Sequence, residues 1–290
     1  MRGAENRGAE EIVSSFSIDW LNLREEADLR ARDPALLSRA RRWLEVAGAE
    51  GAEAAANVVV DLGAGTGATL RALAAIGGSH PVPAVWRLLD HDKSLLAEAN
   101  RRHGSSQQLE IYPVDLANVA TLPLNGVRLV TASALFDLVS AEFIEALTAA
   151  LLRASGNNQV GIYSALNYDG TTDWEPAHPL DKTVLAAFNR DQRQDKGFGP
   201  ALGPDAGRCM AEIFSKAGFV VHTAESPWQL GATDKALVNN LIEGISEAVA
   251  NDATLDPTEL TDWTRFRQSH VATGSCKVGH ADILAISRPR

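Results

Sequence analysis

The residues best suited to do chemistry are an aspartate and three glycines in the run Asp61-Leu62-Gly63-Ala64-Gly65-Thr66-Gly67. An apolar, β-branched stretch, residues 57–62, leads into the glycines, and apolar residues at helical spacing follow from Ala68. This order predicts a strand, a tight turn and a helix. Because glycine has no side chain, a ligand can lie against the backbone N–H groups that open the helix. The turn is therefore suited to a nucleotide-like cofactor.

Two further aspartates follow the next two predicted strands. Asp90 ends the second strand, and Asp115 comes just after the third. Because the carboxyl ends of parallel strands meet at one edge of an open α/β sheet, both acids and Asp61 should lie along that edge. Asp90 can accept both hydroxyls of a ribose there. Its alternative role is a helix N-cap, which Asp92 could supply instead, and the alternative for Asp115 is a surface turn.

An aspartate two residues before the first of three alternating glycines gives the spacing D-x-G-x-G-x-G. This spacing resembles motif I of the class I S-adenosylmethionine-dependent methyltransferases. The looser dinucleotide pattern G-x-G-x-x-G/A is also present, with Gly63, Gly65 and Ala68. The cofactor of the family carries a cationic amine and a sulfonium, so Asp61 beside the turn is favourable, whereas it would repel a pyrophosphate. A turn that serves only strand-to-helix packing is a further alternative.

The resemblance implies S-adenosylmethionine as the cofactor, with contacts at the strand ends. In the family, an acid after the third strand holds the adenine amino group beside an apolar ring face, as Asp115 and Leu116 would. Small residues after the fourth strand face the methyl donor, as Ser133 and Ala134 would. The implied cofactor-binding residues are Asp61, Gly63, Ala64, Gly65, Gly67, Asp90, His91, Asp115, Leu116, Ser133 and Ala134.

The predicted fold is α/β, a Rossmann-like three-layer sandwich with a seven-stranded, mostly parallel sheet. Strands are predicted at residues 57–62, 85–89, 109–113, 127–131, 159–164, 219–223 and 281–287. The resemblance implies that the last strand is antiparallel and lies beside the fifth and the sixth. The methyltransferase domain would span residues 57–290, and residues 1–56 would form an N-terminal helical segment that covers the pocket.

Two helices separated by Pro34 are predicted within residues 18–46. Six arginines crowd this segment, and we expect most of them to form a solvated helix face. The six are Arg24, Arg30, Arg32, Arg39, Arg41 and Arg42. Arg24 is the exception, because N-terminal helices often cover the cofactor pocket in the family.

Residues 171–207 form an insertion that is rich in polar and aromatic groups and too long for an ordinary loop. We expect it to contain a helix over residues 182–194 and to act as a lid over a small polar acceptor. The candidate substrate-binding residues, on the lid and on neighbouring segments, are Arg24, Asn167, Asn189, Arg193 and Lys196.

Three residues are candidates for handling the proton of the acceptor. Asp137 follows the fourth strand and could be a general base or a substrate anchor, since catalytic protons are handled within hydrogen-bond reach. It could equally cap the helix predicted over residues 141–152. Tyr168 and His178 are further candidates, although a single histidine without a visible partner is more often structural.

Composition restricts the partners of the protein. The 290 residues carry 37 acidic and 27 basic side chains, a formal net charge of −10, with no basic block. Nucleic acid and anionic membranes are therefore disfavoured. Two cysteines without a C-x-x-C pair predict reduced thiols, and no metal site is predicted. With no secretory signal and no apolar run of about 20 residues, we expect a cytoplasmic protein, and a homodimer is compatible with the sequence.

The predicted activity is methyl transfer from S-adenosylmethionine to an oxygen or nitrogen of a small-molecule metabolite. The acidic charge favours such an acceptor, and so does the lack of the N-P-P-Y or D-P-P-Y tetrapeptide that many methyltransferases of nucleobase or protein amino groups carry after the fourth strand. The alternatives are an NAD(P)-dependent Rossmann oxidoreductase, an aminopropyl transferase that uses the decarboxylated cofactor, and a protein that binds the cofactor without turnover.

Overall fold

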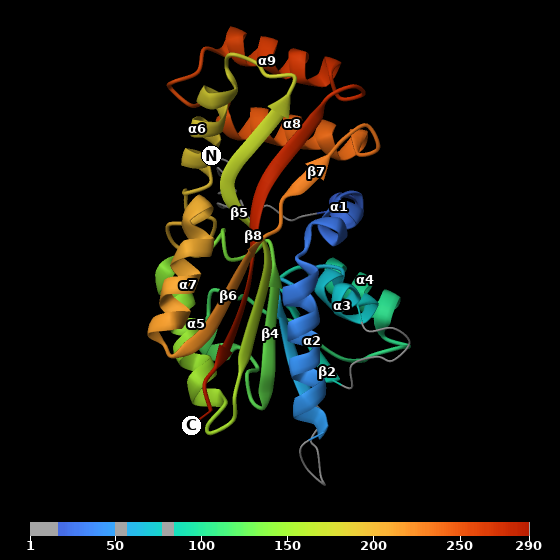
Figure 1. Ribbon diagram of the computed structural model, residues 1–290, viewed down its shortest axis with the longest axis vertical. Helices are drawn as coiled ribbons and strands as arrows, with labels where there is room; N and C mark the ends of the chain where they lie inside the picture. Colours follow the sequence, from blue (N-terminus) through green and yellow to red (C-terminus); the bar gives the residue numbers. More distant parts are fainter. Residues whose placement is uncertain (1–16, 50–56, 77–83, 290) are drawn as a thin grey trace, which may run out of the picture.

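The computed structural model describes residues 17–49, 57–76 and 84–289, which form a twisted sheet with helices on both faces (Figure 1). The strands are β1 (Asn57–Leu62), β2 (Ala84–Asp90), β3 (Gln108–Pro113), β4 (Val127–Ser133), β5 (Gly161–Glu175), β6 (Phe219–Glu225), β7 (Trp228–Leu230) and β8 (Ser275–Ser287). Their order across the sheet is β3-β2-β1-β4-β5-β8-β6, and β7 pairs with β8.

The sheet is parallel from β3 to β5, whereas β8 lies antiparallel between β5 and β6. The predicted Rossmann-like sheet, with its antiparallel last strand beside the fifth and the sixth, is confirmed. The short strand β7 adds an eighth strand that the sequence did not predict, because it is only three residues long. The strand order reverses between β1 and β4, and ligands of open α/β sheets bind outside the carboxyl ends of the strands at such a point.

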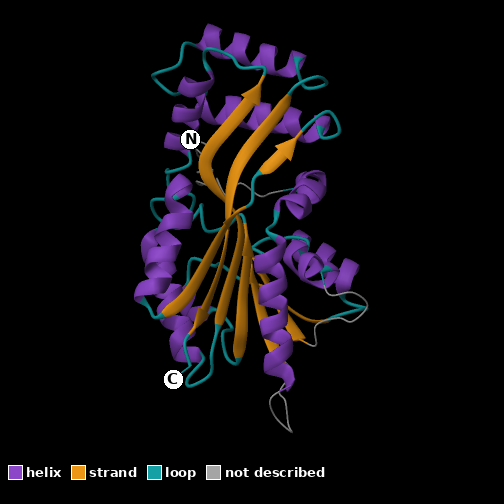
Figure 2. Cartoon of the chain, viewed as in Figure 1, coloured by secondary structure: helices purple, strands orange, loops and turns teal. Residues whose placement is uncertain are grey.

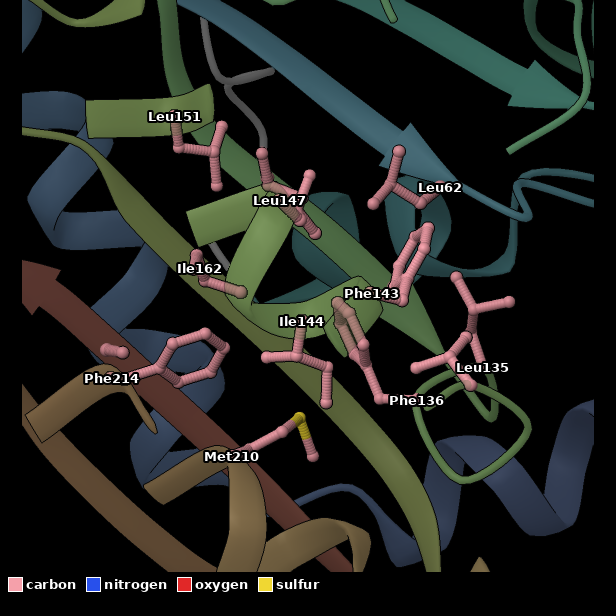
Figure 3. Close-up of a cluster of buried hydrophobic side chains, with 14 of the residues drawn as sticks. Leu62, Leu135, Phe136, Phe143, Ile144, Leu147, Leu151, Ile162, Met210 and Phe214 are labelled. Atoms are coloured by element: carbon pink, nitrogen blue, oxygen red, sulfur yellow. The ribbon is translucent and has the colours of Figure 1, made fainter. Parts of the chain in front are cut away.

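The helices in the described residues are α1 (Ile18–Ala31), α2 (Pro34–Ala49), α3 (Ala68–Ala75), α4 (Lys93–His103), α5 (Ala141–Ala154), α6 (Asp181–Asp191), α7 (Ala206–Lys216), α8 (Lys235–Val249) and α9 (Pro257–Ser269). One face of the sheet packs against α2, α3 and α4, and the other against α5 and α7. On the second face, Phe136, Ile144, Leu147 and Phe214 are fully buried in a dense apolar cluster (Figure 3). These three layers form the main sheet region.

β5 and β8 are the longest strands, and they continue beyond the edge of the main sheet (Figure 2). Above this edge they pair with each other and with β7, and α6, α8 and α9 cover them. We call this region, residues 168–191 and 228–280, the cap. It has an apolar core of its own, to which Val184, Trp228, Leu237, Ile242, Trp263 and Val278 belong.

The cap differs from the predicted lid at residues 171–207. Residues 171–175 belong to β5, α6 ends at Asp191, and most of the apolar core of the cap comes from residues 228–280. The helix α9 was not predicted. The cap arises because segments far apart in the chain pack together, α6 on α8 and α8 on α9, and a local sequence pattern does not show such contacts.

The passage from the main sheet to the cap is marked by irregular strand pairing. The register between β5 and β8 shifts between Ser164 and Asn167 and again between Tyr168 and Thr172. Gly170 has a left-handed φ of 91°, and a Cβ at this position would lie 2.7 Å from the Pro204 Cβ. Only glycine fits there. The irregular ribbon leads the chain past the strand ends and into the base of the cap.

Candidate functional site

The glycine turn joins β1 to α3. Gly63, Gly65 and Gly67 have left-handed φ values of 61°, 53° and 85°, which other residues rarely adopt. The N–H of Ala64 donates to the carbonyl of Leu89 at 3.0 Å and ties the turn to the end of β2. The structure therefore contains the strand, turn and helix that the sequence predicts.

Asp90 is buried at the end of β2, with 6% of its surface exposed, and it faces the glycine turn. Its Oδ2 accepts from the N–H of Gly65 at 2.9 Å, and its Oδ1 accepts from the N–H of Asp92 at 3.0 Å. The N-cap of α4 is Asp92, which accepts from the N–H groups of Ser94 and Leu95. Asp90 is thus not needed as the N-cap, and its carboxylate lies against the backbone of the glycine turn.

Asp61 lies inside β1 and is 1% exposed. Its Oδ1 accepts from the hydroxyl of Thr131 on β4 at 2.6 Å. Burial raises the pKa of Asp61 to about 7, and the hydrogen bond from Thr131 and the charge of Arg32 offset this effect only in part. A cation next to such a carboxylate would stabilise its charged form, so the environment favours a cationic ligand near the turn.

The other implied cofactor contacts at the ends of β2 and β3 are less enclosed. Asp115 is exposed, and its Oδ1 accepts from the N–H of Ala117 at 2.9 Å in the turn after β3. Its neighbour Leu116 is buried. His91 is exposed, with Nδ1 at 3.4 Å from Asp90 Oδ1. Their contacts with the cofactor stay predictions.

The chain leaves β4 through a residue in an uncommon conformation. Ala134 has a left-handed φ of 50°, and its N–H donates to the carbonyl of Ala165 at 2.9 Å. Ser133, the last residue of β4, accepts at Oγ from Nη2 of Arg32 at 2.8 Å. Backbone strain of this kind concentrates at functional sites, and here it coincides with the strand end that the resemblance places opposite the methyl donor.

Arg32, directly after α1, is a site residue that the sequence did not single out. It is 4% exposed, and its Nη1 has no hydrogen-bond partner among the described residues. The expected solvated face is wrong for Arg32 and for Arg41, which is 3% exposed and donates to the carbonyl of Leu73 at 2.8 Å. Packing of α2 against the sheet and α3 encloses this side of the segment. No signal in the sequence separates these two arginines from their exposed neighbours.

α1 lies over the glycine turn. The Cδ1 of Leu21 is 3.1 Å from the position that a Cβ on Gly65 would take. Two turns further along α1, Asp28 accepts from the indole N–H of Trp228 in β7 at 2.9 Å. The helix therefore covers the turn and connects it to the cap.

Ion pairs hold α1 to both regions. Glu25 pairs with Arg71 of α3, just behind the glycine turn. Arg30 pairs with Asp234, the residue that precedes α8 in the cap, at 2.5 Å. The N-terminal helix is therefore fixed at two places, one in each region of the molecule.

Arg24 lies on α1 near the end of β4. Its guanidinium pairs with Asp28 at 2.8 Å and lies 5.0 Å from the centre of the Trp228 ring. Its charge acts on Asp137, the carboxylate that follows β4. The structure thus brings Arg24 together with one predicted catalytic residue, and its contact with a substrate stays a prediction.

Asp137 is buried, with 8% of its surface exposed, and its Oδ1 has no hydrogen-bond partner in the part of the chain that the structure describes. Burial raises the pKa of Asp137 to about 6, and the charge of Arg24 lowers it only in part. The N-cap of α5 is Ser140, whose Oγ accepts from the N–H of Phe143 at 3.3 Å. Ser140 thus takes the capping role considered for Asp137. Oδ1 of Asp137 is therefore not used as a cap.

Tyr168 and Asn189 are joined at the base of the cap. The Tyr168 hydroxyl donates to Oδ1 of Asn189 at 2.9 Å, and Nδ2 of Asn189 donates to the carbonyl of Gly170 at 2.9 Å. Burial raises the pKa of the Tyr168 phenol, which is therefore protonated at neutral pH, and the charge of Asp137 acts in the same direction. The structure brings Tyr168 close to Asp137, while the roles of both residues toward an acceptor stay predictions.

The side chain of Asn167 is hydrogen-bonded within the sheet. It is 0% exposed, and both ends of its amide are used inside the sheet. Its Oδ1 accepts from the hydroxyl of Ser164 at 2.9 Å, and its Nδ2 donates to the carbonyl of Ala281 at 2.9 Å. The irregular pairing of β5 and β8 thus uses this side chain inside the sheet, and its contact with a substrate stays a prediction.

His178 lies in the turn before α6, next to α9 at the far end of the cap. Its ring is 4.8 Å from that of Phe266, and its Nδ1 accepts from the N–H of Leu180 at 3.2 Å. The structure does not bring this histidine to the strand ends, where the other candidates for proton handling lie.

Arg193 and Lys196 pair with carboxylates of the same segment. Arg193 pairs with Asp205 at 3.0 Å and is 45% exposed, and Lys196 pairs with Asp191 at 3.0 Å and is 30% exposed. These ion pairs lie within the segment itself, so the substrate contacts of Arg193 and Lys196 stay predictions.

Residues 17–49, 57–76 and 84–289 contain no group of three or more histidine, cysteine, aspartate or glutamate side chains that could hold a metal ion. In the same ranges, no helix combines the length and apolar character needed to span a bilayer. Cys209 and Cys276 are free thiols.

No family model and no curated protein matches this chain. Solved structures are similar to it. The YcgJ protein from Bacillus subtilis is 13% identical, with 88% of this chain and 99% of that chain covered and a TM-score of 0.49. Magnesium protoporphyrin IX methyltransferase from Synechocystis, solved with bound S-adenosylhomocysteine, is 16% identical over 73% and 82%, with a TM-score of 0.43. Geranyl diphosphate C-methyltransferase from Streptomyces coelicolor, in complex with S-adenosyl-L-homocysteine, is 11% identical over 87% and 76%, with a TM-score of 0.41.

Two of these three similar proteins are methyltransferases with S-adenosylhomocysteine bound. At these identities and TM-scores, the likeness concerns the fold and does not identify a ligand of this chain. The basis for a function is therefore the glycine turn and the buried carboxylates at the reversal of the strand order.

Proposed function

We propose that this protein is an S-adenosylmethionine-dependent methyltransferase that transfers a methyl group to an oxygen or nitrogen of a small-molecule acceptor. The observation that carries the proposal is the buried carboxylate of Asp90, hydrogen-bonded to the N–H of Gly65 in the glycine turn. A second buried carboxylate, Asp61, lies on β1, where the strand order reverses. Together they suit a ligand that carries both a ribose and a cationic amine.

The described residues fit the parts of S-adenosylmethionine. Asp90 suits the ribose hydroxyls, because its buried oxygens are hydrogen-bond acceptors at the turn. Asp61 suits the cationic amine. The Nη1 of Arg32, without a partner among the described residues, suits the carboxylate of the cofactor. A dinucleotide would instead bring a pyrophosphate close to Asp61, which like-charge repulsion disfavours.

When bound, S-adenosylmethionine supplies a methyl group on a positively charged sulfur. The residues around it orient the acceptor for in-line displacement, and such orientation contributes much of the catalysis. Asp137 is the general base in this proposal, because its pKa of about 6 is near the range in which a base works well at neutral pH. Tyr168 stays protonated and holds Asn189 beside the site.

Asp90→Ala tests the proposal by isothermal titration calorimetry. Loss of a buried acceptor for the ribose should weaken S-adenosylmethionine binding by about 1–3 kcal/mol. Asp92→Ala is the matched control, because this carboxylate caps α4 and does not face the turn, so the affinity should stay unchanged. Equal affinity of Asp90→Ala and the unchanged protein would contradict the proposal, and so would saturable NAD binding without heat from S-adenosylmethionine. Release of S-adenosylhomocysteine in the presence of an acceptor separates an enzyme from a protein that only binds the cofactor.

A further inference from the structure

Side chains from α1, β5, β7, β8 and the loop after β4 meet at the base of the cap. Tyr168 and His280 are paired across β5 and β8, with ring centres 6.4 Å apart. The ring of Trp228 lies 5.1 Å from that of His280, and the guanidinium of Arg24 lies 5.0 Å from the Trp228 ring. The charge of Arg24 acts on Asp137 as well as on His280. We call these five residues the junction cluster.

Two polar atoms of the junction cluster are buried without a hydrogen-bond partner in the described part of the chain. They are Oδ1 of Asp137, in a residue that is 8% exposed, and Nδ1 of His280, in a residue that is 6% exposed. Proteins rarely leave buried polar atoms unpaired, because such atoms lose their hydrogen bonds to water. Two of them in one cluster point to a polar ligand.

The charges of the junction cluster do not suit an anion or a second cation. Arg24 is already paired with Asp28 at 2.8 Å, and it lies over the face of Trp228, where it would repel another cation. Burial and the charge of Arg24 lower the pKa of His280 to about 4, so the imidazole is uncharged at neutral pH. The buried rings of Trp228 and Tyr168 surround these polar atoms with aromatic carbon. An uncharged, flat molecule with a hydrogen-bond donor fits these groups.

We propose that the junction cluster binds the acceptor, an uncharged, flat molecule whose reacting hydroxyl or amine donates a hydrogen bond to Oδ1 of Asp137. Nδ1 of His280 binds a second polar group of the same molecule. This assignment rests on the methyltransferase function proposed above. In the transfer, the acceptor oxygen or nitrogen forms a bond to the methyl carbon while the carbon–sulfur bond breaks. The electron pair of that bond goes to the sulfur, which becomes uncharged in S-adenosylhomocysteine, and the acceptor proton goes to Asp137.

Four probes separate the features of this acceptor. Phenol is flat, uncharged and a hydrogen-bond donor, whereas anisole lacks the donor, cyclohexanol lacks the flat ring and benzoate carries a negative charge. Each is titrated into protein saturated with S-adenosylhomocysteine, and binding is measured by nuclear magnetic resonance. Phenol should bind about tenfold more tightly than each of the others. Absence of phenol binding, or binding of anisole or benzoate as tight as that of phenol, would overturn the proposal.

Two variants test whether phenol binds at the junction cluster. Asp137→Ala and His280→Phe each remove one unpartnered atom, and His280→Phe keeps an aromatic ring. Each should weaken phenol binding several-fold and leave the affinity for S-adenosylhomocysteine within about twofold. His222→Phe is the matched control, because its Nε2 also lacks a partner among the described residues but lies on β6, outside the junction cluster. Phenol binding that is equal in all variants would mean that the unpartnered atoms hold only water, and the proposal would fail.

The acceptor site and the methyltransferase function fail in distinguishable ways. If the unchanged protein does not bind S-adenosylhomocysteine, the methyltransferase function fails, while phenol titrated into the unloaded protein still tests the junction cluster. If S-adenosylhomocysteine binds normally and neither variant weakens phenol binding, the acceptor site alone fails. Thermal unfolding shows whether each variant is folded, and His280→Asn provides the same test if His280→Phe does not fold.

Discussion

The main sheet region and the cap are stabilised in different ways. Between the main sheet and the helices α5 and α7, apolar side chains fill the interior, and Phe136 and Phe214 are 0% exposed. The cap has an apolar core too, but it also encloses a charge. Arg267 is 2% exposed, pairs with Asp181, and lies 5.1 Å from the centre of the Trp174 ring. The main sheet thus depends on hydrophobic burial, whereas the cap also depends on the pairing of a buried charge.

The unpartnered polar atoms near the strand ends belong to neither interior. Arg32, Asp137 and His280 lie where α1, the main sheet and the cap meet. Buried polar atoms without partners are unfavourable for folding, and such exceptions are expected at functional sites. The two regions thus have separate apolar interiors, and the proposed site lies at their boundary.

The largest effect should follow from a change in the main sheet region. Phe214→Ala removes a fully buried ring from the apolar cluster and should lower the free energy of unfolding by about 3–5 kcal/mol, because a cavity remains. Urea denaturation measures the change. Leu29→Ala is the control, because Leu29 is 53% exposed and its removal should matter little. A loss for Phe214→Ala as small as that of the control would break the comparison.

A somewhat smaller loss should follow from removal of the buried charge in the cap. Arg267→Met leaves Asp181 without its cation and should lower the free energy of unfolding by about 3 kcal/mol. Arg265→Met is the matched control on the same helix, because Arg265 pairs with Asp262 at the surface and is 73% exposed. The double variant Arg267→Met, Asp181→Leu should recover part of the loss, since no unpaired charge remains. A double variant less stable than Arg267→Met would show that the charge pairing is not the cause.

At the boundary between the main sheet region and the cap, a substitution should raise the free energy of unfolding. Asp137→Asn should stabilise the ligand-free protein. The folded pKa of about 6 lies above the ordinary value of 3.8, so the folded carboxyl binds its proton more tightly than the unfolded one. Its contribution to stability therefore falls as the pH rises from about 4 to about 6. The variant should gain up to about 3 kcal/mol well above this window and little below it. Urea denaturation of both proteins, below about pH 4 and above about pH 6, measures the gain. An equal gain at both pH values would contradict the raised pKa of Asp137.

The smallest effect should be a proton exchange when the cofactor binds. Burial raises the pKa of Asp61 to about 7, and a cation beside the carboxylate lowers it again. Near neutral pH, part of the Asp61 carboxyls should release a proton on binding S-adenosylmethionine. The heat measured by calorimetry should then differ between phosphate and Tris buffers, and Asp61→Asn should remove the difference. Identical heats in both buffers would show that the cation lies elsewhere.

Much of the main sheet could be predicted from local signals. β1 covers the predicted residues 57–62, which a β-branched run marks in the sequence, and Asp92 caps α4, the role considered for it. The cap could not be predicted in this way. The fifth strand was expected to end at residue 164, but β5 continues to Glu175. Its polar upper part becomes a strand only through pairing with β8 and β7, which come much later in the chain.

The site was predicted in the same uneven manner. The positions of Asp61 and Asp90 could be predicted, because their place in the chain, before the glycine turn and at the end of a strand, sets their place in the fold. Arg32 and His280 were not found, because their surroundings come from distant segments. Arg32 reaches Ser133 of β4, and His280 acquires its aromatic neighbours only when β5, β7 and β8 pair. Composition and spacing do not contain these contacts.

The position of α1 has a consequence for the speed of ligand exchange. The Cδ1 of Leu21 is 3.1 Å from the position that a Cβ on Gly65 would take, so this side chain restricts access to that side of the turn. We expect the helix to move when a ligand reaches this side of the turn, which would require the pair between Glu25 and Arg71 to open. Ligand association would then be limited by this opening of α1 and not by diffusion. Added salt should accelerate the association, because it weakens the pair between Glu25 and Arg71.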